Sequence, residues 1–204
     1  MTSPTLFTPL KVGRYSLSHR VVMAPLTRRR AGHPGNVPTD LSVEYYSQRA
    51  SHGGLIITEG SQIAPSAQGY PNTPGIHSPE QVAGWKKIVD AVHEKGGIIF
   101  LQLWHTGRIS HSSFQPDGIR PAAPSAIAAA GTTLTSEWNQ LPFETPRALS
   151  PSEIKGIITD YRLAAQHALE AGFDGVEVHG ANGYLIEQFL HTRTNQRTDA
   201  WWPS

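Results

Sequence analysis

Four short apolar runs alternate with helix signals along the chain, and this alternation limits the fold more than any other feature. The runs are rich in β-branched residues and cover residues 21–26, 55–58, 98–103 and 175–178. Continuous apolar runs of this length are typical of strands that are buried on both faces, as in a parallel sheet. Because helices separate the runs, the sequence predicts βαβ units and an α/β fold.

The helices between these strands are predicted from their caps and their periodicity. Residues 78–81 (Ser-Pro-Glu-Gln) and 150–153 (Ser-Pro-Ser-Glu) each place a hydroxyl at the N-cap, a proline at the first helical position and a Gln or Glu three residues after the cap. Apolar residues follow both signals at helical spacing, and Gly96 and Gly172 end the two patterns. A weaker pattern predicts a helix over residues 40–51.

Two segments look like one structural unit used twice: residues 91–105 and residues 168–180. Each contains a helix end, a glycine stop, a buried strand and a polar tip with a histidine. A short hairpin around residues 11–15 precedes the first strand and is expected to close the bottom of a barrel. Residues 106–149 are rich in Pro, Ala, Ser and Gly and show little periodicity, which predicts a functional loop or lid.

Charge and composition exclude several classes of function. The 17 Lys and Arg residues against 16 Asp and Glu residues give a net charge of +1, so we expect neither a nucleic acid nor a membrane as partner. The chain has no cysteine, which excludes a disulfide framework, a thiolate metal site and a cysteine nucleophile. Neither a signal peptide nor an apolar window of membrane-spanning length is found. We therefore expect one cytoplasmic globular domain over residues 1–204.

Polar side chains gather at the predicted carboxyl ends of the strands, where α/β folds place their chemistry. They are Thr27, Glu59, Gln102, Trp104, His105, His179 and Tyr184. Each of them alone has an ordinary structural explanation. Four neighbouring strand ends that all carry such groups favour a functional site.

Two kinds of site fit this set of side chains. The first is a metal site for hydrolysis, with Glu59, His105 and His179 as oxygen and nitrogen ligands. The sequence lacks the H-x-H and H-E-x-x-H spacings that would make this interpretation strong. The second is a site for a flat organic cofactor that forms hydrogen bonds with the protein. The two kinds of site assign functional roles to different residues.

In the cofactor site, Thr27 and Gln102 supply hydrogen-bonding groups and Gly60 allows close approach of the backbone. His179 and Asn182 are then expected to bind a substrate oxygen, with a tyrosine about one helical turn further on as proton donor.

Four segments of the sequence resemble motifs of the Old Yellow Enzyme family. They are residues 22–28 (VMAPLTR), 56–60 (IITEG), 102–108 (QLWHTGR) and 179–190 (HGANGYLIEQFL). The resemblance runs in order from about residue 6 to residue 199, and the threonine at position 27 is similar to the branch that does not carry cysteine there. It implies an FMN-dependent ene reductase with a (β/α)₈ TIM barrel, which reduces the C=C bond of activated alkenes (enones) with NAD(P)H. This chain is then expected to hold about the first four βα units and the preceding hairpin.

The resemblance also implies individual roles. The flavin-binding residues are expected to be Ala24, Pro25, Thr27, Gly60 and Gln102. Trp104 is expected to shape the substrate pocket. His179 and Asn182 are expected to donate hydrogen bonds to the carbonyl oxygen of the enone. Hydride then comes from flavin N5 and the proton from Tyr184.

Members of the family run to about twice this length, so the resemblance implies a truncated barrel domain. The later strands, a basic residue near flavin N1 and the phosphate-binding loops are expected to be missing. The family pattern stops after Asp199, which predicts a frameshift or a truncation. A half barrel exposes two strand edges and an apolar face. We therefore expect self-association, a complementing second half-barrel or an inactive remnant, together with weak FMN retention.

Overall fold

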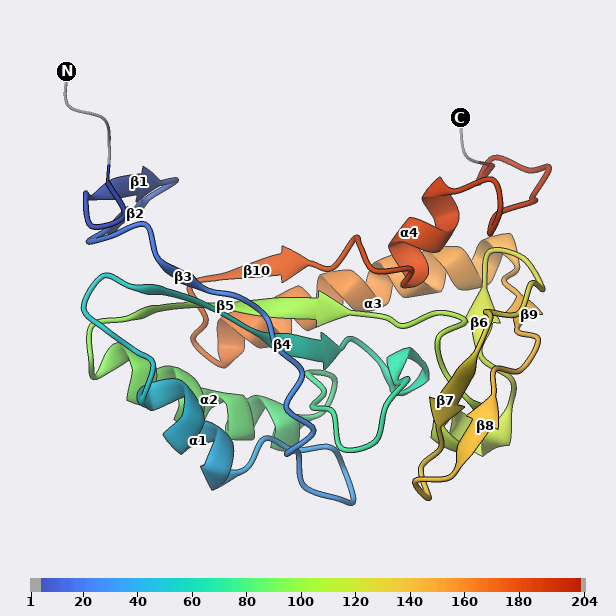
Figure 1. Cartoon of the computed structure of the whole chain (residues 1–204), viewed down its shortest axis with the longest axis horizontal. Coiled ribbons are helices and arrows are strands. Elements are labelled where there is room, and N and C mark those ends of the chain that lie inside the picture. Colours follow the sequence, from blue (N-terminus) through green and yellow to red (C-terminus); the bar gives the residue numbers. More distant parts are fainter. Residues whose placement is uncertain (1–4, 203–204) are drawn as a thin grey trace.

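The computed structural model describes residues 5–202, so Pro203 and Ser204 of the divergent end lie outside the described residues. Its centre is a four-stranded parallel sheet in the order β10-β5-β4-β3. The strands are β3 (Val22–Met23), β4 (Leu55–Gln62), β5 (Ile98–Trp104) and β10 (Gly175–Val178). The connecting helices are α1 (Asp40–Ser47), α2 (Pro79–His93) and α3 (Pro151–Glu170). The predicted alternation of strands and helices and the α/β class are confirmed (Figure 1).

Both predicted capping boxes are present. The Ser78 hydroxyl accepts the backbone N–H of Gln81, and the Gln81 side chain accepts the backbone N–H of Ser78 at 3.1 Å. Ser150 and Glu153 repeat the arrangement at the start of α3. Because these bonds satisfy backbone donors at the first turn, the sequence alone sets where both helices begin. The weaker helix, α1, ends earlier than predicted.

Two strands differ in length from their predictions. β3 has two residues instead of the six predicted over 21–26, because it is an edge strand that pairs only with β4 and Pro25 has no N–H to extend the ladder. β4 runs four residues beyond the predicted end. Its pairing with β5 shifts register between Ile57 and Gly60, where the Thr58 hydroxyl accepts the backbone N–H of Gln102 at 3.1 Å.

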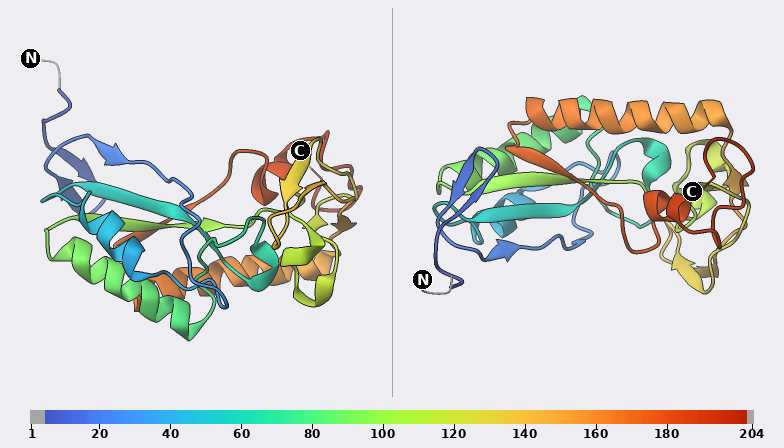
Figure 2. Two further views of the ribbon diagram at one scale, coloured as in Figure 1. Left: turned by 60° about the horizontal axis from the view of Figure 1, so that its bottom comes forward. Right: turned by 90° about the horizontal axis from the view of Figure 1, so that it is seen from above.

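The sheet has one face covered by helices and one face that they leave open (Figure 2). On the covered face, alternate residues of β5 pack with apolar residues of α2 and α3 and are almost fully buried: Ile99, Leu101 and Leu103. Phe100, Gln102 and Trp104 alternate with them and point to the opposite face. At the rim of the sheet Leu26 is 56% exposed and Val178 is 54% exposed.

The predicted hairpin is formed by β1 (Leu10–Val12) and β2 (Tyr15–Leu17). It lies at the amino ends of β5 and β10 (Figure 1). The Tyr15 ring packs edge-on against Phe100 with centroids 5.9 Å apart, and its hydroxyl donates to the carbonyl oxygen of Asp174 at 2.6 Å. The hairpin therefore covers the end of the sheet where the sequence placed it.

Residues 106–149 contain more regular structure than the predicted loop. β6 (Ala122–Ala123) pairs with β9 (Arg147–Ala148), and β7 (Thr132–Leu134) pairs with β8 (Gln140–Pro142). Strands of two or three residues are too short to produce a periodic pattern, which is why the sequence did not reveal them. α4 (Leu185–Leu190) follows β10 and was also not predicted. Within residues 5–202, no helix is long and apolar enough to cross a membrane.

Candidate active site

A cavity of about 620 Å³ opens at the carboxyl ends of β5 and β10. Gln102 and Trp104 of β5 line it, together with His179, which directly follows β10. The loop after β3 adds Pro25 and Thr27, and the turn before α4 adds Asn182 and Tyr184. The structure therefore brings together most of the side chains that the sequence proposed for a cofactor site.

Two predicted flavin-binding residues, Ala24 and Gly60, do not line this cavity. Gly60 lies against the indole of Trp104, and a Cβ at Gly60 would lie 2.8 Å from Trp104 Cδ2. The close approach that requires glycine here is therefore made by a side chain of the protein itself. Trp104 is only 2% exposed, so the indole has little room to move.

Trp104 is the centre of an aromatic cluster. The Tyr70 ring stacks on the indole at 5.7 Å and 12°, and the His179 ring stacks at 6.3 Å and 16°. Tyr184 contacts it edge-on at 5.0 Å and 85°. The indole Nε1–H is buried and has no hydrogen-bond partner within the described part of the chain.

Tyr184 is paired with Tyr70 through their hydroxyl oxygens, which lie 3.2 Å apart. Burial, reinforced by the hydrogen bond to Tyr70, raises the pKa of Tyr184 well above its ordinary value. The phenol is therefore protonated at neutral pH, as a proton donor must be.

His179 is neutral, since its partial burial lowers the pKa below the usual value. Its Nδ1 accepts the backbone N–H of Ala181 at 3.4 Å. The proton of the neutral ring is therefore placed on Nε2, which leaves Nε2–H as a donor. Asn182 lies at the exposed turn with φ +59°, a conformation that asparagine tolerates better than most residues.

Glu177 also lines the cavity, and it holds the side chain of Gln102. Gln102 Nε2 donates to Glu177 Oε1 at 2.7 Å, and the two residues are direct partners in the β5–β10 ladder. Glu177 is the acidic residue among the described residues that line the cavity, and none of these lining residues is Lys or Arg.

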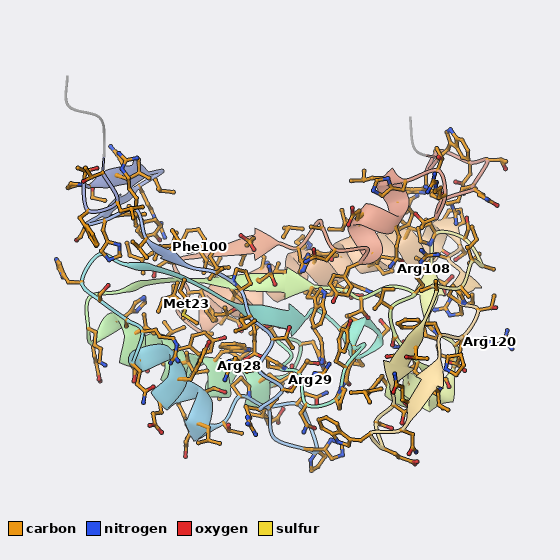
Figure 3. All side chains as sticks on the ribbon, in the orientation of Figure 1. Met23, Arg28, Arg29, Phe100, Arg108 and Arg120 are labelled. Atoms are coloured by element: carbon orange, nitrogen blue, oxygen red, sulfur yellow. The ribbon has the colours of Figure 1, made fainter. Side chains whose placement is uncertain are left out.

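Glu59 is buried, does not line the cavity, and links the loop after β3 to α1. Its Oε2 accepts the backbone N–H of Arg28 at 2.8 Å, and the Tyr46 hydroxyl donates to Oε1 at 3.4 Å. Burial raises the pKa of Glu59 to about 7. Arg28 and Arg29 both belong to this loop (Figure 3). Their guanidinium groups lie over the rings of Tyr45 and Tyr70, at 4.4 and 5.1 Å.

The alternative metal site is not assembled. Across residues 5–202, no three His, Cys, Asp or Glu side chains are grouped so that they could hold a metal ion. Glu59 and His105 do not line the cavity that contains His179. His105 is buried, its Nδ1 accepts the backbone N–H of Gly107 at 3.1 Å, and burial lowers the pKa of its imidazole to about 3. His105 is therefore a neutral structural histidine, and the interpretation as a hydrolase metal site is wrong.

Neither Tyr70 nor a role for Glu177 was predicted from the sequence. Tyr70 lies in an irregular segment between β4 and α2, where no periodicity indicates which way a side chain points. Glu177 was detectable in principle, because it lies on the predicted strand 175–178 two positions before His179, and alternate residues of an extended segment share a face.

The sequence matches the NADH:flavin oxidoreductase / NADH oxidase family over residues 5–204. It is 52% identical over 196 residues to 12-oxophytodienoate reductase 1 of Oryza sativa subsp. japonica, covering 96% of this chain and 50% of the relative. It is 52% identical over 204 residues to 12-oxophytodienoate reductase 2 of Arabidopsis thaliana, covering 98% of this chain and 53% of the relative. The chain spans about half the length of the curated relatives that it matches.

Solved structures give the same result. The chain superposes on morphinone reductase with a TM-score of 0.93 and 54% identity, covering 100% of this chain and 55% of the other. A morphinone reductase structure in complex with tetrahydroNAD gives a TM-score of 0.93 and 55% identity, covering 99% of this chain and 56% of the other. The predicted first half of a TIM barrel is confirmed. The chain belongs to the NADH:flavin oxidoreductase / NADH oxidase family, which is the Old Yellow Enzyme family that the sequence resembles.

Proposed function

We propose that this chain supplies the flavin-ring and substrate-binding half of an FMN-dependent ene reductase, which reduces the C=C bond of activated alkenes with NAD(P)H. The observation that carries the proposal is one cavity that is lined by two sets of groups. One set is a hydrogen-bonding edge with Thr27 and Gln102, and the other is a donor set with His179, Asn182 and Tyr184. One similar curated protein is a 12-oxophytodienoate reductase and one similar solved structure is a morphinone reductase, and both names support a reductase.

The lining residues fit the ring system of a flavin. Pro25 and Leu26 supply an apolar wall, and Thr27 supplies a hydroxyl. After its bond to Glu177, Gln102 keeps its carbonyl oxygen and one N–H for a planar ligand. A volume of about 620 Å³ is within the range of small-molecule sites. No Lys or Arg is found among these described lining residues, so they fit the ring of the cofactor and not its phosphate.

When bound, the flavin supplies hydride transfer from a nicotinamide to the β-carbon of the alkene. The residues of this chain then act on the substrate carbonyl. His179 donates through Nε2–H and Asn182 through its amide to the oxygen on which negative charge develops. Loss of one such donor typically costs about 3 kcal/mol of transition-state stabilisation. Tyr184 holds its proton at neutral pH and delivers it to the α-carbon, which balances the hydride and completes the addition of two hydrogens.

A partner is proposed from the surfaces that the described residues leave open. An apolar groove of about 420 Å³ lies between α3, α4 and Ala200–Trp202, and the buried hydroxyl of Tyr161 in it has no hydrogen-bond partner within residues 5–202. The solved relatives continue beyond the region that this chain matches. The proposed occupant is therefore a complementing second half-barrel, and self-association of this chain is the alternative outcome of a native-mass measurement. Neither nucleic acid nor a membrane is proposed as a partner, and the cytoplasm is the proposed location.

The proposed function is tested by titrating the purified chain with FMN and with riboflavin, followed by flavin fluorescence. The residues that line the cavity fit the flavin ring and not the phosphate. We therefore expect the protein to quench the fluorescence of both ligands, with dissociation constants within about threefold of each other. We also expect weak retention of FMN through gel filtration. Enone-dependent oxidation of NADPH by the flavin-loaded protein, with native mass recorded on the same sample, tests the reaction. Absence of quenching with both ligands would contradict the flavin site.

A further inference from the structure

Gln102 and Glu177 form a charge-assisted pair on the open face of the sheet. They are direct partners in the parallel β5–β10 ladder, and Gln102 Nε2 donates to Glu177 Oε1 at 2.7 Å. The backbone of Gln102 is also held, because its N–H donates to the Thr58 hydroxyl at 3.1 Å. Gln102 is only 7% exposed, so its amide has few competing partners in water.

This pair fixes which end of the Gln102 amide faces a ligand. A carboxylate only accepts hydrogen bonds, so the reversed amide would place its carbonyl oxygen against a negatively charged oxygen. Hydrogen bonds to a charged partner are about twice as strong as neutral ones, which makes the observed orientation strongly preferred. Gln102 is left with a carbonyl oxygen and one N–H for a ligand in the cavity.

We propose that Glu177 is a positioning residue that sets the orientation of the Gln102 amide and thereby selects the ligand. The inference rests on the proposed function, because it concerns recognition within the same site. The complementary ligand edge carries a ring N–H donor beside a carbonyl acceptor, as in a cyclic imide. The ring N–H donates to Gln102 Oε1, and the remaining Gln102 N–H donates to the ring carbonyl. Without Glu177, the amide is free to reverse.

Glu177 also places a carboxylate next to the Gln102 amide, where the ligand edge would bind. A carboxylate at that position disfavours negative charge on a bound ring. Removing the charge therefore shifts the reduction potential of a bound flavin upward. A purely structural role of Glu177 does not predict this change.

The first measurement uses the flavin-free chain. The side-chain amide ¹⁵N–¹H resonances of Gln102 are compared between the wild type and Glu177→Gln, and they are assigned by their loss in Gln102→Leu. We expect two widely separated amide proton shifts in the wild type, because one proton binds a carboxylate, and a smaller separation in Glu177→Gln. The exposed carboxylate of Glu170 provides the matched control, since Glu170→Gln should leave the resonances unchanged.

The second measurement compares riboflavin with N3-methylriboflavin, which lacks the imide N–H, by fluorescence titration. The wild type and Glu170→Gln should bind the methylated ligand about tenfold more weakly, the effect of one lost hydrogen bond. Glu177→Gln should reduce this discrimination to about threefold or less. The potential of bound riboflavin should rise in the same variant.

Unchanged Gln102 resonances together with unchanged discrimination in Glu177→Gln would overturn the proposal. If no flavin binds to the wild type, the proposed function fails, and the resonances alone decide whether Glu177 orients Gln102. If Glu177→Gln does not fold, Glu177→Asp is used. Its shorter side chain should disturb the amide resonances while keeping the charge, and unchanged resonances there would overturn the proposal.

Discussion

The hydroxyl oxygens of Tyr70 and Tyr184 lie 3.2 Å apart beside Trp104, although 114 positions separate the two residues in the chain. Tyr70 belongs to the segment between β4 and α2, and Tyr184 precedes α4. Both rings contact the indole of Trp104, one stacked and one edge-on. The proposed proton donor is therefore held by a hydrogen bond and by packing at the same time, which limits the directions in which its O–H can point.

Replacing Tyr184 by Phe removes the proposed proton but keeps the ring contact with Trp104. We expect Tyr184→Phe to slow enone reduction by about 10²–10⁴-fold, the usual contribution of a general acid. Flavin reduction by NADPH should change far less, since it needs no proton from Tyr184. Stopped-flow measurement of the two half-reactions separates them. Tyr70→Phe is the matched control and should produce a smaller loss, and equal slowing of both half-reactions in Tyr184→Phe would remove Tyr184 from this role.

Gly60 is expected to tolerate no side chain. A Cβ there would lie 2.8 Å from Trp104 Cδ2 and Cε3, and the buried indole cannot move away without disturbing Tyr70 and His179. Gly60→Ala should destabilise the protein by about 1–3 kcal/mol, the usual cost of overpacking. Urea unfolding followed by tryptophan fluorescence measures the change.

Gly156 in α3 gives the comparison for this substitution, because a Cβ there meets nothing within 4 Å. Gly156→Ala should stabilise the protein by about 0.5–1 kcal/mol, since alanine favours a helix interior. A similar stabilisation by Gly60→Ala would show that the contact with Trp104 is not tight.

Glu59 should make the protein less stable as the pH rises. Burial raises the pKa of its carboxyl from 4.5 to about 7, so the folded state binds the proton more tightly than the unfolded state. This contribution is fully present below pH 4.5 and is lost as the pH rises through 7, with a magnitude of up to about 3 kcal/mol. Denaturant midpoints measured from pH 4.5 to 8 test it. Glu59→Gln should flatten the profile, and Glu170→Gln, which removes an exposed carboxylate, should not.

His105 should give the opposite dependence of protein stability on pH. Burial lowers the pKa of its imidazole from 6.5 to about 3, so the unfolded state binds the proton more tightly. Its contribution to stability is fully present above pH 6.5 and is lost as the pH falls toward 3. His105→Gln should reduce this acid sensitivity, and its side-chain oxygen can still accept the Gly107 N–H. Added Zn²⁺ should leave the Tm of the wild type unchanged, and a rise that depends on His105 would restore the metal interpretation.

The sequence predicted the fold through signals that neighbouring residues carry. The two capping boxes need residues only three positions apart, Ser78 with Gln81 and Ser150 with Glu153, and both were found as predicted. The prediction was poorer for β3, whose length depends on pairing at a sheet edge, and for the short strands of residues 106–149. The length of β3 depends on β4, a partner that is distant in the chain. β7 and β8 pair as a local hairpin, but strands of three residues are too short to produce a periodic pattern.

By itself, the sequence determined the order of strands and helices, the helix starts and the polar residues that follow each strand. Periodicity and capping are local, so they can be read without knowing what packs against what. Only the tertiary structure decided how those polar residues are paired. Gln102 bonds to Glu177 across 75 positions, and Glu59 bonds to the backbone of Arg28 across 31. Strand register and loop paths bring these groups within hydrogen-bond distance, and a 2.7 Å contact depends on both.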